Sequence, residues 1–383
     1  MTNPKTDHQS ISSKPPLLKL VVLMFTGTAL ISLFAVPWYG LNYGFSTSAW
    51  VLFALFWLLN GISITTGYHR LWSHRSFKAR PILRWFLAIW GAQALQNDIM
   101  TWASRHRNHH KFVDNNDKDP YSAGRGFWFS HLGWMLRDYP SGDLDFSNIP
   151  DLKRDPIVVW QARWYWPLTA FMNIGLPIIL GLLLGDLWGI VLLAGVFRLF
   201  ISHHMTFFIN SLAHIWGKQT YTEDNSARDN WVVALLTWGE GYHNFHHIFQ
   251  SDYRNGVRWW QFDLTKWFIN MCKYMGLVSE LRRVPKFRIL RARLAMEFKR
   301  AHAQVQETQF GQRWKTVVEQ EYQQFRKTIA EWQELQAEKA NEVSEKLRSR
   351  WQKTAFHTRV KELEYRLKMQ RRRIALISVG LVK

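Results

Sequence analysis

Eight histidines fall into three short clusters whose spacing suits metal binding. The third cluster, GYHNFHH at residues 241–247, places three histidines at positions i, i+3 and i+4, which share one face of a helix: His243, His246 and His247. The sequence HRNHH repeats this spacing with His106, His109 and His110. In the first cluster, HRLWSH, His69 and His74 are five residues apart, which predicts a helix end or a bend there. His214 is a ninth candidate.

This number of imidazoles exceeds the needs of a single metal ion. A zinc ion takes about four protein ligands, and imidazole also suits iron and copper. We therefore expect two metal ions, held mainly by histidine.

Four long apolar runs separate and follow these clusters. The first three hold 19, 24 and 22 residues, close to the roughly 20 that cross a ~30 Å hydrocarbon core. The four runs are Leu20–Trp38, Phe45–Tyr68, Trp164–Gly185 and Leu187 to about Ile215. Arg198 interrupts the fourth run and should face the protein interior or reach an interface. The sequence predicts an all-α integral membrane protein with four transmembrane helices.

Two further features bear on the membrane domain. Trp85–Asn97 is apolar but has only 13 residues, which favours an interfacial or re-entrant helix. Cys272 is the only cysteine, which excludes an internal disulfide and a thiolate cluster, so we expect it to be a small buried residue.

The distribution of Lys and Arg predicts the orientation. Basic residues crowd the segments 69–84 and 98–163 and everything after Ala213, whereas the links 39–44 and Asp186 have none. The positive-inside rule then places both termini, all three clusters and the active site on the cytoplasmic side of the inner (cytoplasmic) membrane.

The C-terminal part of the chain has a different composition. Residues 281–383 hold 25 Lys and Arg against 11 Asp and Glu, a net charge of +14 out of +20. We divide the chain into a polar segment 1–16, a membrane domain 17–285 and a basic helical tail 286–383. A heptad-like series runs through Val318, Tyr322, Phe325, Ile329 and Trp332, and Leu335 is one residue off its register.

Several roles for this tail remain open. It could pack on the membrane domain, self-associate with another tail, lie on membrane lipid of the anionic face, or be a solvated basic helix. Nucleic-acid binding is a poor explanation of the charge, because no nucleic-acid motif is present and the basic residues adjoin a membrane domain.

The three histidine clusters, in this order and spacing, resemble the histidine boxes of integral-membrane fatty acyl desaturases. The resemblance covers about residues 17–285 and is greatest to the bacterial stearoyl-CoA (delta-9) type. The segments 96–98, 210–214 and 239–242 and Trp102 also look like sequence of that family. The tail lies outside the resemblance.

The resemblance implies four membrane helices with a cytosolic helical cap that holds two iron ions. The positions that match the family's ligands are His69, His74, His106, His109, His110, His214, His243, His246 and His247, with Asn210 acting through water. It also implies that dioxygen and two external electrons convert a methylene pair into a cis double bond. Zinc has no redox chemistry, so iron is the consistent ion.

Each ligating ring should donate its other N–H to a neighbouring group. The acidic residues near the clusters in sequence are the candidates for this role: Asp98, Asp117, Asp119, Asp229, Glu240 and Asp252. His131, His203 and His204 match no ligand position and are predicted to be non-ligands.

The resemblance also proposes residues that contact the substrate. Gln96, Trp102 and Thr206 match positions that shape the bend of the acyl tunnel. Asn97 and Arg137 are expected to face the carrier headgroup. Ser104-Arg105 stands where animal acyl-CoA enzymes have an Arg-Asp pair, although Arg105 can still bind a phosphate. The carrier, coenzyme A or a glycerolipid, therefore stays open.

Other functions are compatible with parts of the sequence. A membrane diiron hydroxylase of lipids or alkanes shares histidine clusters but has different spacings. A metal transporter would place its ligands within the spans, and a membrane scaffold would leave the clustered histidines unused. Electrons are expected from a separate donor such as ferredoxin with its reductase, docking on basic residues of the cap: Arg105, Arg107, Lys111 and Arg254.

Overall fold

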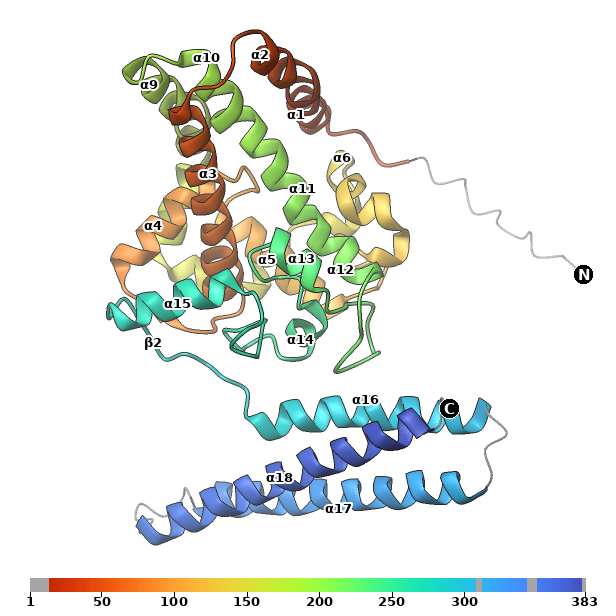
Figure 1. Ribbon diagram of the computed structural model, residues 1–383. Helices are drawn as coiled ribbons and strands as arrows, with labels where there is room; N and C mark the ends of the chain where they lie inside the picture. Colours follow the sequence, from red (N-terminus) through yellow and green to blue (C-terminus); the bar gives the residue numbers. More distant parts are fainter. Residues whose placement is uncertain (1–13, 308–311, 343–349, 381–383) are drawn as a thin grey trace, which may run out of the picture. The chain divides into compact units, whose positions relative to one another are not determined.

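The computed structural model describes residues 14–307, 312–342 and 350–380. These residues form two compact units (Figure 1). The first holds the described residues up to Gly217 together with Ser226–Arg282, and the second holds Lys218–Asn225 and the described residues from Arg283 onward.

Four helices of the first unit are long and apolar enough to cross a membrane. They run over Lys19–Asn42, Thr47–Ser73, Tyr165–Leu183 and Leu187–Ile215, within a few residues of the predicted runs. Each combines α-helical segments with a π-helical stretch. The first contains α1 (Lys19–Leu30), Ile31–Ala35 in π form and α2 (Val36–Asn42), and the second α3 (Thr47–Ile62) and π-helical Ser63–Ser73. The third contains α8 (Tyr165–Ala170), π-helical Phe171–Gly175 and α9 (Leu176–Leu183), and the fourth α10 (Leu187–Ile190), π-helical Val191–Phe197, α11 (Arg198–Asn210) and α12 (Leu212–Ile215).

Tight links join these helices in pairs. Gly44 and Gly185 have φ values of +73° and +72°, a left-handed conformation that glycine adopts without steric cost. Ser46 then caps α3, because its hydroxyl accepts the backbone N–H of Ala49 at 3.1 Å. Arg198 is buried and donates to the carbonyl oxygen of Gln93 and the side chain of Asn173, which confirms that it faces the interior.

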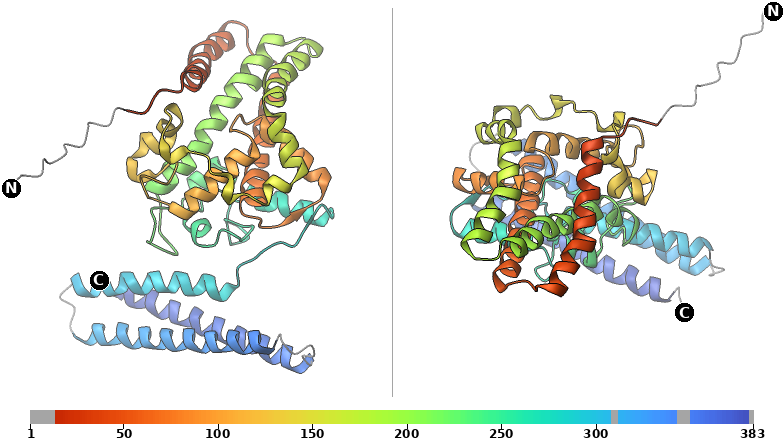
Figure 2. Two further views of the ribbon diagram at one scale, coloured as in Figure 1. Left: turned by 180° about the vertical axis from the view of Figure 1, so that it is seen from behind. Right: turned by 90° about the horizontal axis from the view of Figure 1, so that it is seen from above.

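The remaining helices of the first unit are short and form a cap around the ends of α3 and α11 (Figures 1 and 2). Those between the second and third spans are α4 (Pro81–Ala92), α5 (Ile99–Phe112), α6 (Trp134–Leu136) and α7 (Pro156–Arg163). The same stretch contains π-helical Phe129–Gly133 and 3₁₀ turns at Ala123–Arg125, Pro140–Gly142, Phe146–Asn148 and Leu152–Arg154. After the fourth span come α13 (Trp231–Leu236), α14 (His243–Ile248) and α15 (Leu264–Tyr274).

Strand pairing is minor and ties distant segments together. β1 (Lys78–Ala79) pairs antiparallel with β2 (Val278–Ser279), so the segment after the second span meets the end of the first unit. A single bridge joins Leu17 to Arg137, and the N–H of Leu18 donates to the carbonyl of Leu136 at 2.9 Å. A short apolar helix was expected over residues 85–97, and α4 is such a helix but begins four residues earlier and ends five residues earlier. Cys272 is buried, as predicted.

The second unit contains a three-helix bundle, here called the tail bundle: α16 (Lys286–Glu307), α17 (Gln312–Glu342) and α18 (Arg350–Gly380). The three helices lie side by side in Figures 1 and 2 and enclose a common apolar core. Phe287, Phe298, Val318, Phe325 and Leu367 are among its buried residues.

The heptad-like series of the sequence lies inside this core. Val318 and Phe325 are buried, and Tyr322, Ile329 and Trp332 pack against them. Leu335, which is off the heptad register, is 4% exposed and continues the same core. The seam is thus covered by α16 and α18 of the same chain, so self-association of the tail would need another surface.

Candidate functional site

Two short helices supply six of the nine predicted metal ligands. α5 begins at Asp98, whose carboxylate accepts the N–H groups of Met100 and Thr101. Near the other end of α5, His106 and His110 point to one group of histidines and His109 to another. The histidines of α14 are distributed in the reverse proportion: His246 joins the first group, and His243 and His247 join the second. In each helix, an i, i+4 pair serves one group and the remaining histidine serves the other.

The first cluster reaches the site through a π-helical turn. Ser63–Ser73 is π-helical, and the N–H of His74 donates to the carbonyl of His69 at 3.1 Å. A π turn closes from residue i to residue i+5, so two histidines five residues apart lie on the same face. The helix ends at Ser73, which confirms the helix end that the spacing predicted.

The five-histidine group consists of His69, His74, His106, His110 and His246. All of its ligand atoms lie within 4.8 Å of one another. The Nε2 atoms are 2.8 Å apart between His74 and His106, and His246 Nε2 lies 2.9 Å from that of His110 and 3.0 Å from that of His69.

The four-histidine group consists of His109, His214, His243 and His247, all of them buried. His247 Nε2 lies 3.0 Å from that of His243 and 3.3 Å from that of His109, and the His214 and His243 Nε2 atoms are 3.1 Å apart. His110 and His247 stack with ring centroids 4.3 Å apart, so the two groups are in direct contact.

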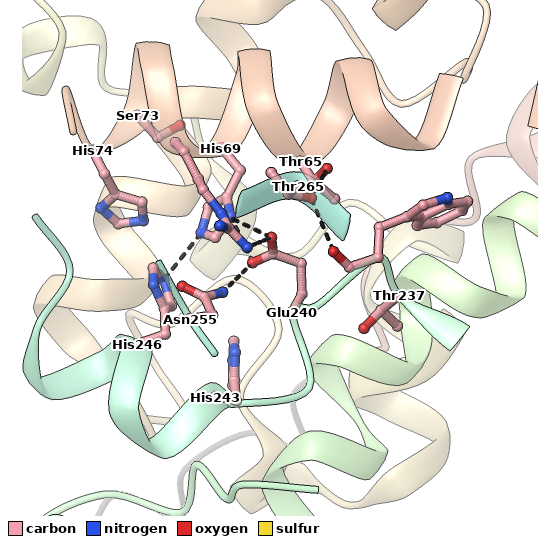
Figure 3. Close-up of polar contacts among 12 residues, drawn as sticks. Thr65, His69, Ser73, His74, Thr237, Glu240, His243, His246, Asn255 and Thr265 are labelled. Atoms are coloured by element: carbon pink, nitrogen blue, oxygen red, sulfur yellow. Dashed lines mark hydrogen bonds and ion pairs between the residues drawn. The ribbon is translucent and has the colours of Figure 1, made fainter. Parts of the chain in front are cut away.

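A buried ion network holds His69 in place (Figure 3). Glu240 Oε2 accepts from His69 Nδ1 at 2.8 Å and from the Asn255 side chain at 2.6 Å. Its other oxygen accepts from Arg70 at 2.7 Å, and Arg70 also pairs with Asp263 at 3.0 Å. Burial alone would raise the pKa of Glu240, but Arg70 and His69 beside it lower this pKa to about 2. Glu240 is therefore a carboxylate that accepts from His69.

Different partners hold the four-histidine group. Asp119 accepts from His109 Nδ1 at 2.9 Å, and its carboxylate also accepts the backbone N–H groups of Asp114 and Tyr121. His214 Nδ1 lies 2.7 Å from the hydroxyl of Ser226, which itself donates to Asp114 at 2.5 Å. Because that donation uses the only hydroxyl proton, Ser226 accepts from His214.

These partners decide which ring nitrogen is free to bind metal. His69, His109 and His214 each carry their proton on Nδ1, so each Nε2 presents a lone pair. Lone pairs that converge at about 3 Å repel one another, and a cation between them removes that repulsion. Metal–imidazole bonds of about 2.1 Å at right angles would place neighbouring nitrogens ~3.0 Å apart, which matches both groups.

Burial also favours neutral rings. The pKa values of six predicted ligands outside the spans lie well below the usual value, first because burial penalises the charged form and then because other histidines are near: His74, His106, His110, His243, His246 and His247. Neutral imidazole is the form that binds metal. The residues present therefore fit two metal ions.

The acidic candidates have several partners. Glu240 and Asp119 contact predicted ligands. Asp98 caps α5, and Asp252 pairs with Arg254. Asp229 accepts the N–H of Phe245 in α14, and the side chain of Asp117 is exposed. The sequence alone did not identify Arg70, Ser226 or Asp114, because their roles depend on contacts between segments far apart in the chain.

A cavity of about 460 Å³ adjoins both groups. His69 and His106 of the five-histidine group and His243 of the four-histidine group line it. All six predicted substrate contacts and Asn210 line it as well: Gln96, Asn97, Trp102, Arg105, Arg137 and Thr206. Leu20, Val21, Met24 and Phe25 of α1 provide an apolar wall.

Polar contacts fix the middle of this cavity. Gln96 donates to Thr206 at 3.0 Å and accepts from the Trp102 indole at 3.4 Å. Trp102 stacks on His106 with centroids 4.8 Å apart, which connects the cavity wall to the five-histidine group. Leu95 and Asn97, on either side of Gln96, have φ values of +52° and +72°. This conformation is strained for leucine, and it shapes the turn that presents Gln96.

Arg105 and Arg137 contact backbone carbonyls near one end of the cavity. Arg105 donates twice to Gly142 at 3.3 Å, and Arg137 donates to Pro15 at 2.7 Å. Burial lowers the pKa of Arg105. His131 and His204, 3.0 Å apart, and His203, which contacts Ala94, lie outside both histidine groups.

Together, four membrane-crossing helices and two adjoining groups of imidazoles define an all-α integral membrane protein with a candidate dimetal site. Residues 47–278 match the model of the family described as fatty acid desaturase. That match covers more than half of the sequence, and the chain belongs to the fatty acid desaturase family.

Individual relatives agree with this assignment. The chain is 44% identical over 240 residues to a probable acyl-CoA desaturase of Schizosaccharomyces pombe, a match covering 62% of the chain and 50% of that protein. It is 36% identical over 272 residues to an sn-2 palmitoyl-lipid 9-desaturase of Nostoc sp. strain 36, covering 70% and 91%. An acyl-CoA Delta12-desaturase of Acheta domesticus is 40% identical over 239 residues, covering 59% and 65%.

These matches differ in how much of each relative they cover. The chain spans about half the length of the fission-yeast protein but nearly all of the Nostoc protein. The names of the relatives also differ in the acyl carrier and in the position of the double bond.

Proposed function

We propose that this protein is an oxidoreductase that inserts a cis double bond into a long saturated acyl chain. The expected position is delta-9, and the reaction uses dioxygen and two electrons from outside. The observation that carries this proposal is the contact of both histidine groups with one cavity that has an apolar wall on α1. An acyl chain in that cavity would lie against His69, His106 and His243.

Nine side chains would hold two iron ions in two sets: His69, His74, His106, His110 and His246 in one, and His109, His214, His243 and His247 in the other. Asn210 lines the cavity and would act through water. When bound, the iron pair would supply the oxidising power to remove hydrogen from an unactivated methylene, which side-chain acids and bases lack.

The residues of the chain provide binding, orientation and exclusion of water. The α1 wall and the Trp102 ring bury the acyl chain, and the Gln96–Thr206 hydrogen bond fixes the cavity where the chain must bend. Such a cavity would hold one methylene pair beside the metal groups, which would select the position of the double bond.

The names of two relatives bear on the carrier and on the position. A 9-desaturase of a palmitoyl lipid and an acyl-CoA desaturase are both similar to the chain. Arg105, Arg137 and Asn97 would contact the carrier. Arg105 and Arg137 already donate to Gly142 and Pro15, so a phosphate would have to compete with these carbonyls. Acyl-CoA and glycerolipid both remain candidate carriers.

We further propose that the site faces the cytoplasm and receives electrons from a separate ferredoxin-type donor with its reductase. Of the four basic residues expected to dock this donor, Arg107 pairs with Asp151 and Arg254 with Asp252. Lys111 is exposed and Arg105 is half-buried. A reduction rate independent of salt concentration would contradict electrostatic docking.

Expression in a bacterium deficient in desaturation tests the function. Fatty acids from its membranes should contain a new cis-monoene with the wild-type protein and none with His246→Ala. The matched control is His302→Ala, a histidine of the tail bundle outside both groups, which should retain the product.

The product distinguishes the alternatives. A hydroxylated acyl chain would favour a membrane hydroxylase and overturn the proposal, as would a monoene that persists in His246→Ala. Mass-spectrometric location of the double bond tests the delta-9 position. Purified protein supplied separately with stearoyl-CoA and with a saturated glycerolipid tests the carrier.

A further inference from the structure

The tail bundle carries an unusual surface stripe on α18. Five residues at spacings of three or four lie on one side of this helix, which we call the α18 stripe: Lys361, Tyr365, Lys368, Arg372 and Leu376. All five are exposed, and they lie opposite the helix face that buries Leu363, Leu367 and Ile374.

The two apolar members of the stripe are exceptional within the bundle. Tyr365 is 62% exposed and Leu376 is 72% exposed. Among the described side chains from Arg283 onward, these are the only large apolar residues that are exposed. Their presence on the same stripe is not explained by the core of the bundle, which lies on the other side of α18.

The cations of the stripe differ from the neighbouring basic residues. Arg366 pairs with Glu331 and Glu362, while Arg371 and Arg373 pair with Glu297 and Glu321. Three of these pairs join α18 to another helix, and the Arg366–Glu362 pair lies within α18. Across residues 14–307, 312–342 and 350–380, no carboxylate forms an ion pair with Lys361, Lys368 or Arg372.

The charge of the bundle is also unequal among its helices. The described span of α18 contains nine Lys and Arg against two Glu, whereas that of α17 contains five against six. α16 contains six against two, so the positive charge lies on α16 and α18 and not on α17.

We propose that the α18 stripe docks on an anionic lipid surface. Exposed Lys and Arg, without a carboxylate partner among the described residues, alternate here with exposed Tyr and Leu, which is the composition of a helix that lies in the plane of a membrane interface. The stripe is straight and extends about 22 Å, which suits a flat surface. The tail is covalently joined to a membrane domain, so even weak docking would be favoured by the high local concentration of lipid.

This inference is independent of the proposed enzymatic function. It concerns residues outside the matched range 47–278. An acidic protein is the alternative partner for a basic surface, and a second copy of this chain is another. We favour lipid because the exposed Tyr and Leu are of the kind that enter the boundary between headgroups and acyl chains.

Fluorescence quenching of the full-length protein in lipid nanodiscs tests the inference. Thr358→Cys places a label on the outward side of α18, and Gln323→Cys places one on α17. Native Cys272 is 2% exposed, so unsubstituted protein provides the labelling blank. The quencher is a phosphatidylcholine with a nitroxide on its headgroup.

The label at Thr358→Cys should be quenched more strongly in discs that contain phosphatidylglycerol than in discs of phosphatidylcholine alone. Adding 0.5 M salt should reduce the difference. The triple variant Lys361→Gln, Lys368→Gln, Arg372→Gln should abolish it, since each cation contributes about five-fold to the ratio of docked to free tail. The label at Gln323→Cys should respond weakly.

A matched variant separates the stripe from general basicity. Lys315→Gln, Arg326→Gln, Lys327→Gln removes the same charge from exposed positions of α17 and should leave the quenching unchanged. Equal loss in both triple variants, or equal quenching in both kinds of disc, would overturn the proposal. Quenching that depends on protein concentration would instead indicate a second copy, and a requirement for added acidic ferredoxin would indicate a protein partner. Either result also overturns it.

Discussion

The five-histidine and four-histidine groups share two helices but differ in how their rings are held. In the first, His69 is fixed by a carboxylate that belongs to a buried network of Arg70, Glu240 and Asp263. In the second, His109 and His214 are fixed by Asp119 and by a serine that donates to Asp114. The first network contains a buried arginine between two carboxylates, and in the second the carboxylates of Asp119 and Asp114 accept from side chains and backbone N–H groups.

The two sets of contacts should differ in how they affect the stability of the fold and the binding of metal. Because the charged network joins the second span to the segment 240–263, it stabilises the fold as well as His69. In the four-histidine group, the Asp119 contacts lie within residues 109–121, and the Ser226–Asp114 hydrogen bonds join this segment to one 112 residues away without an arginine–carboxylate pair in the contacts named above. We expect changes at the first group to affect stability and metal content together, and changes at the second to affect mainly metal content.

Removing one ligand from each group should give the largest effects. His246→Ala and His247→Ala are neighbours on α14 but belong to different groups. Each should lower desaturation about 100-fold or more, because loss of a ligand should exceed the ~10–100-fold cost of losing a ring's outer partner. Iron per chain, measured by mass spectrometry, should fall toward one in each variant. Two irons retained in both would break the division into two groups.

Replacing the carboxylates that accept from the histidine rings should show how the two groups differ in their effect on stability. His69, Arg70 and Asn255 all donate to Glu240, so Glu240→Gln places an N–H₂ against a donor and leaves Arg70 with one carboxylate partner in place of two. We expect destabilisation of about 3–5 kcal/mol, as for one broken member of a buried ion pair. Thermal unfolding in detergent measures this loss.

Asp119→Asn is the counterpart in the four-histidine group. It should lower iron content in the four-histidine group, with a ~10–100-fold loss of affinity, because the amide disturbs the tautomer of His109. Its unfolding temperature should drop less than that of Glu240→Gln. Equal drops would show that the two groups are supported in the same way.

Ser226→Ala should have a smaller effect. The substitution removes one acceptor for His214 and one donor to Asp114. A lost hydrogen bond of this kind costs about 1–3 kcal/mol when a partner stays buried. We expect weaker retention of one iron during dialysis against a chelator, with Ser226→Thr restoring it.

Gln96→Leu should have the smallest effect on metal and stability. It removes the contacts to Thr206 and Trp102 but keeps the size of the side chain. The expected result is a change in double-bond position or in preferred chain length, with iron content unchanged. Loss of iron instead would show that Gln96 supports His106 through Trp102.

The membrane-spanning helices could be predicted from the sequence more fully than the site could. The four spans were predictable because length and apolarity alone determine them, and the clusters because i, i+3, i+4 spacing places rings together. The assignment of individual rings to two groups was not, since it depends on the angle between α5 and α14. Arg70 and Ser226 were missed because their partners are 170 and 112 residues away.

The tail shows the same limit. Its seam was visible as a series of apolar residues, but the series could not reveal which helix covers it. Leu335 is out of heptad register and still buried, because a three-helix core accepts apolar residues from a broader face than a two-stranded coiled coil does.

The π-helical turn at Ser63–Ser73 has one more consequence. A π-helical turn holds one more residue than an α-helical turn, so the helix continues through an inserted residue. His69 and His74 can therefore be five residues apart and still lie on the same face of the span. Deleting one residue between them would bring the two rings four residues apart, and ordinary α-helical winding would then keep them on one face, because the extra residue and the wider turn compensate for each other. The shortened box would keep both imidazoles and their common direction, so the wide turn is what the additional residue requires.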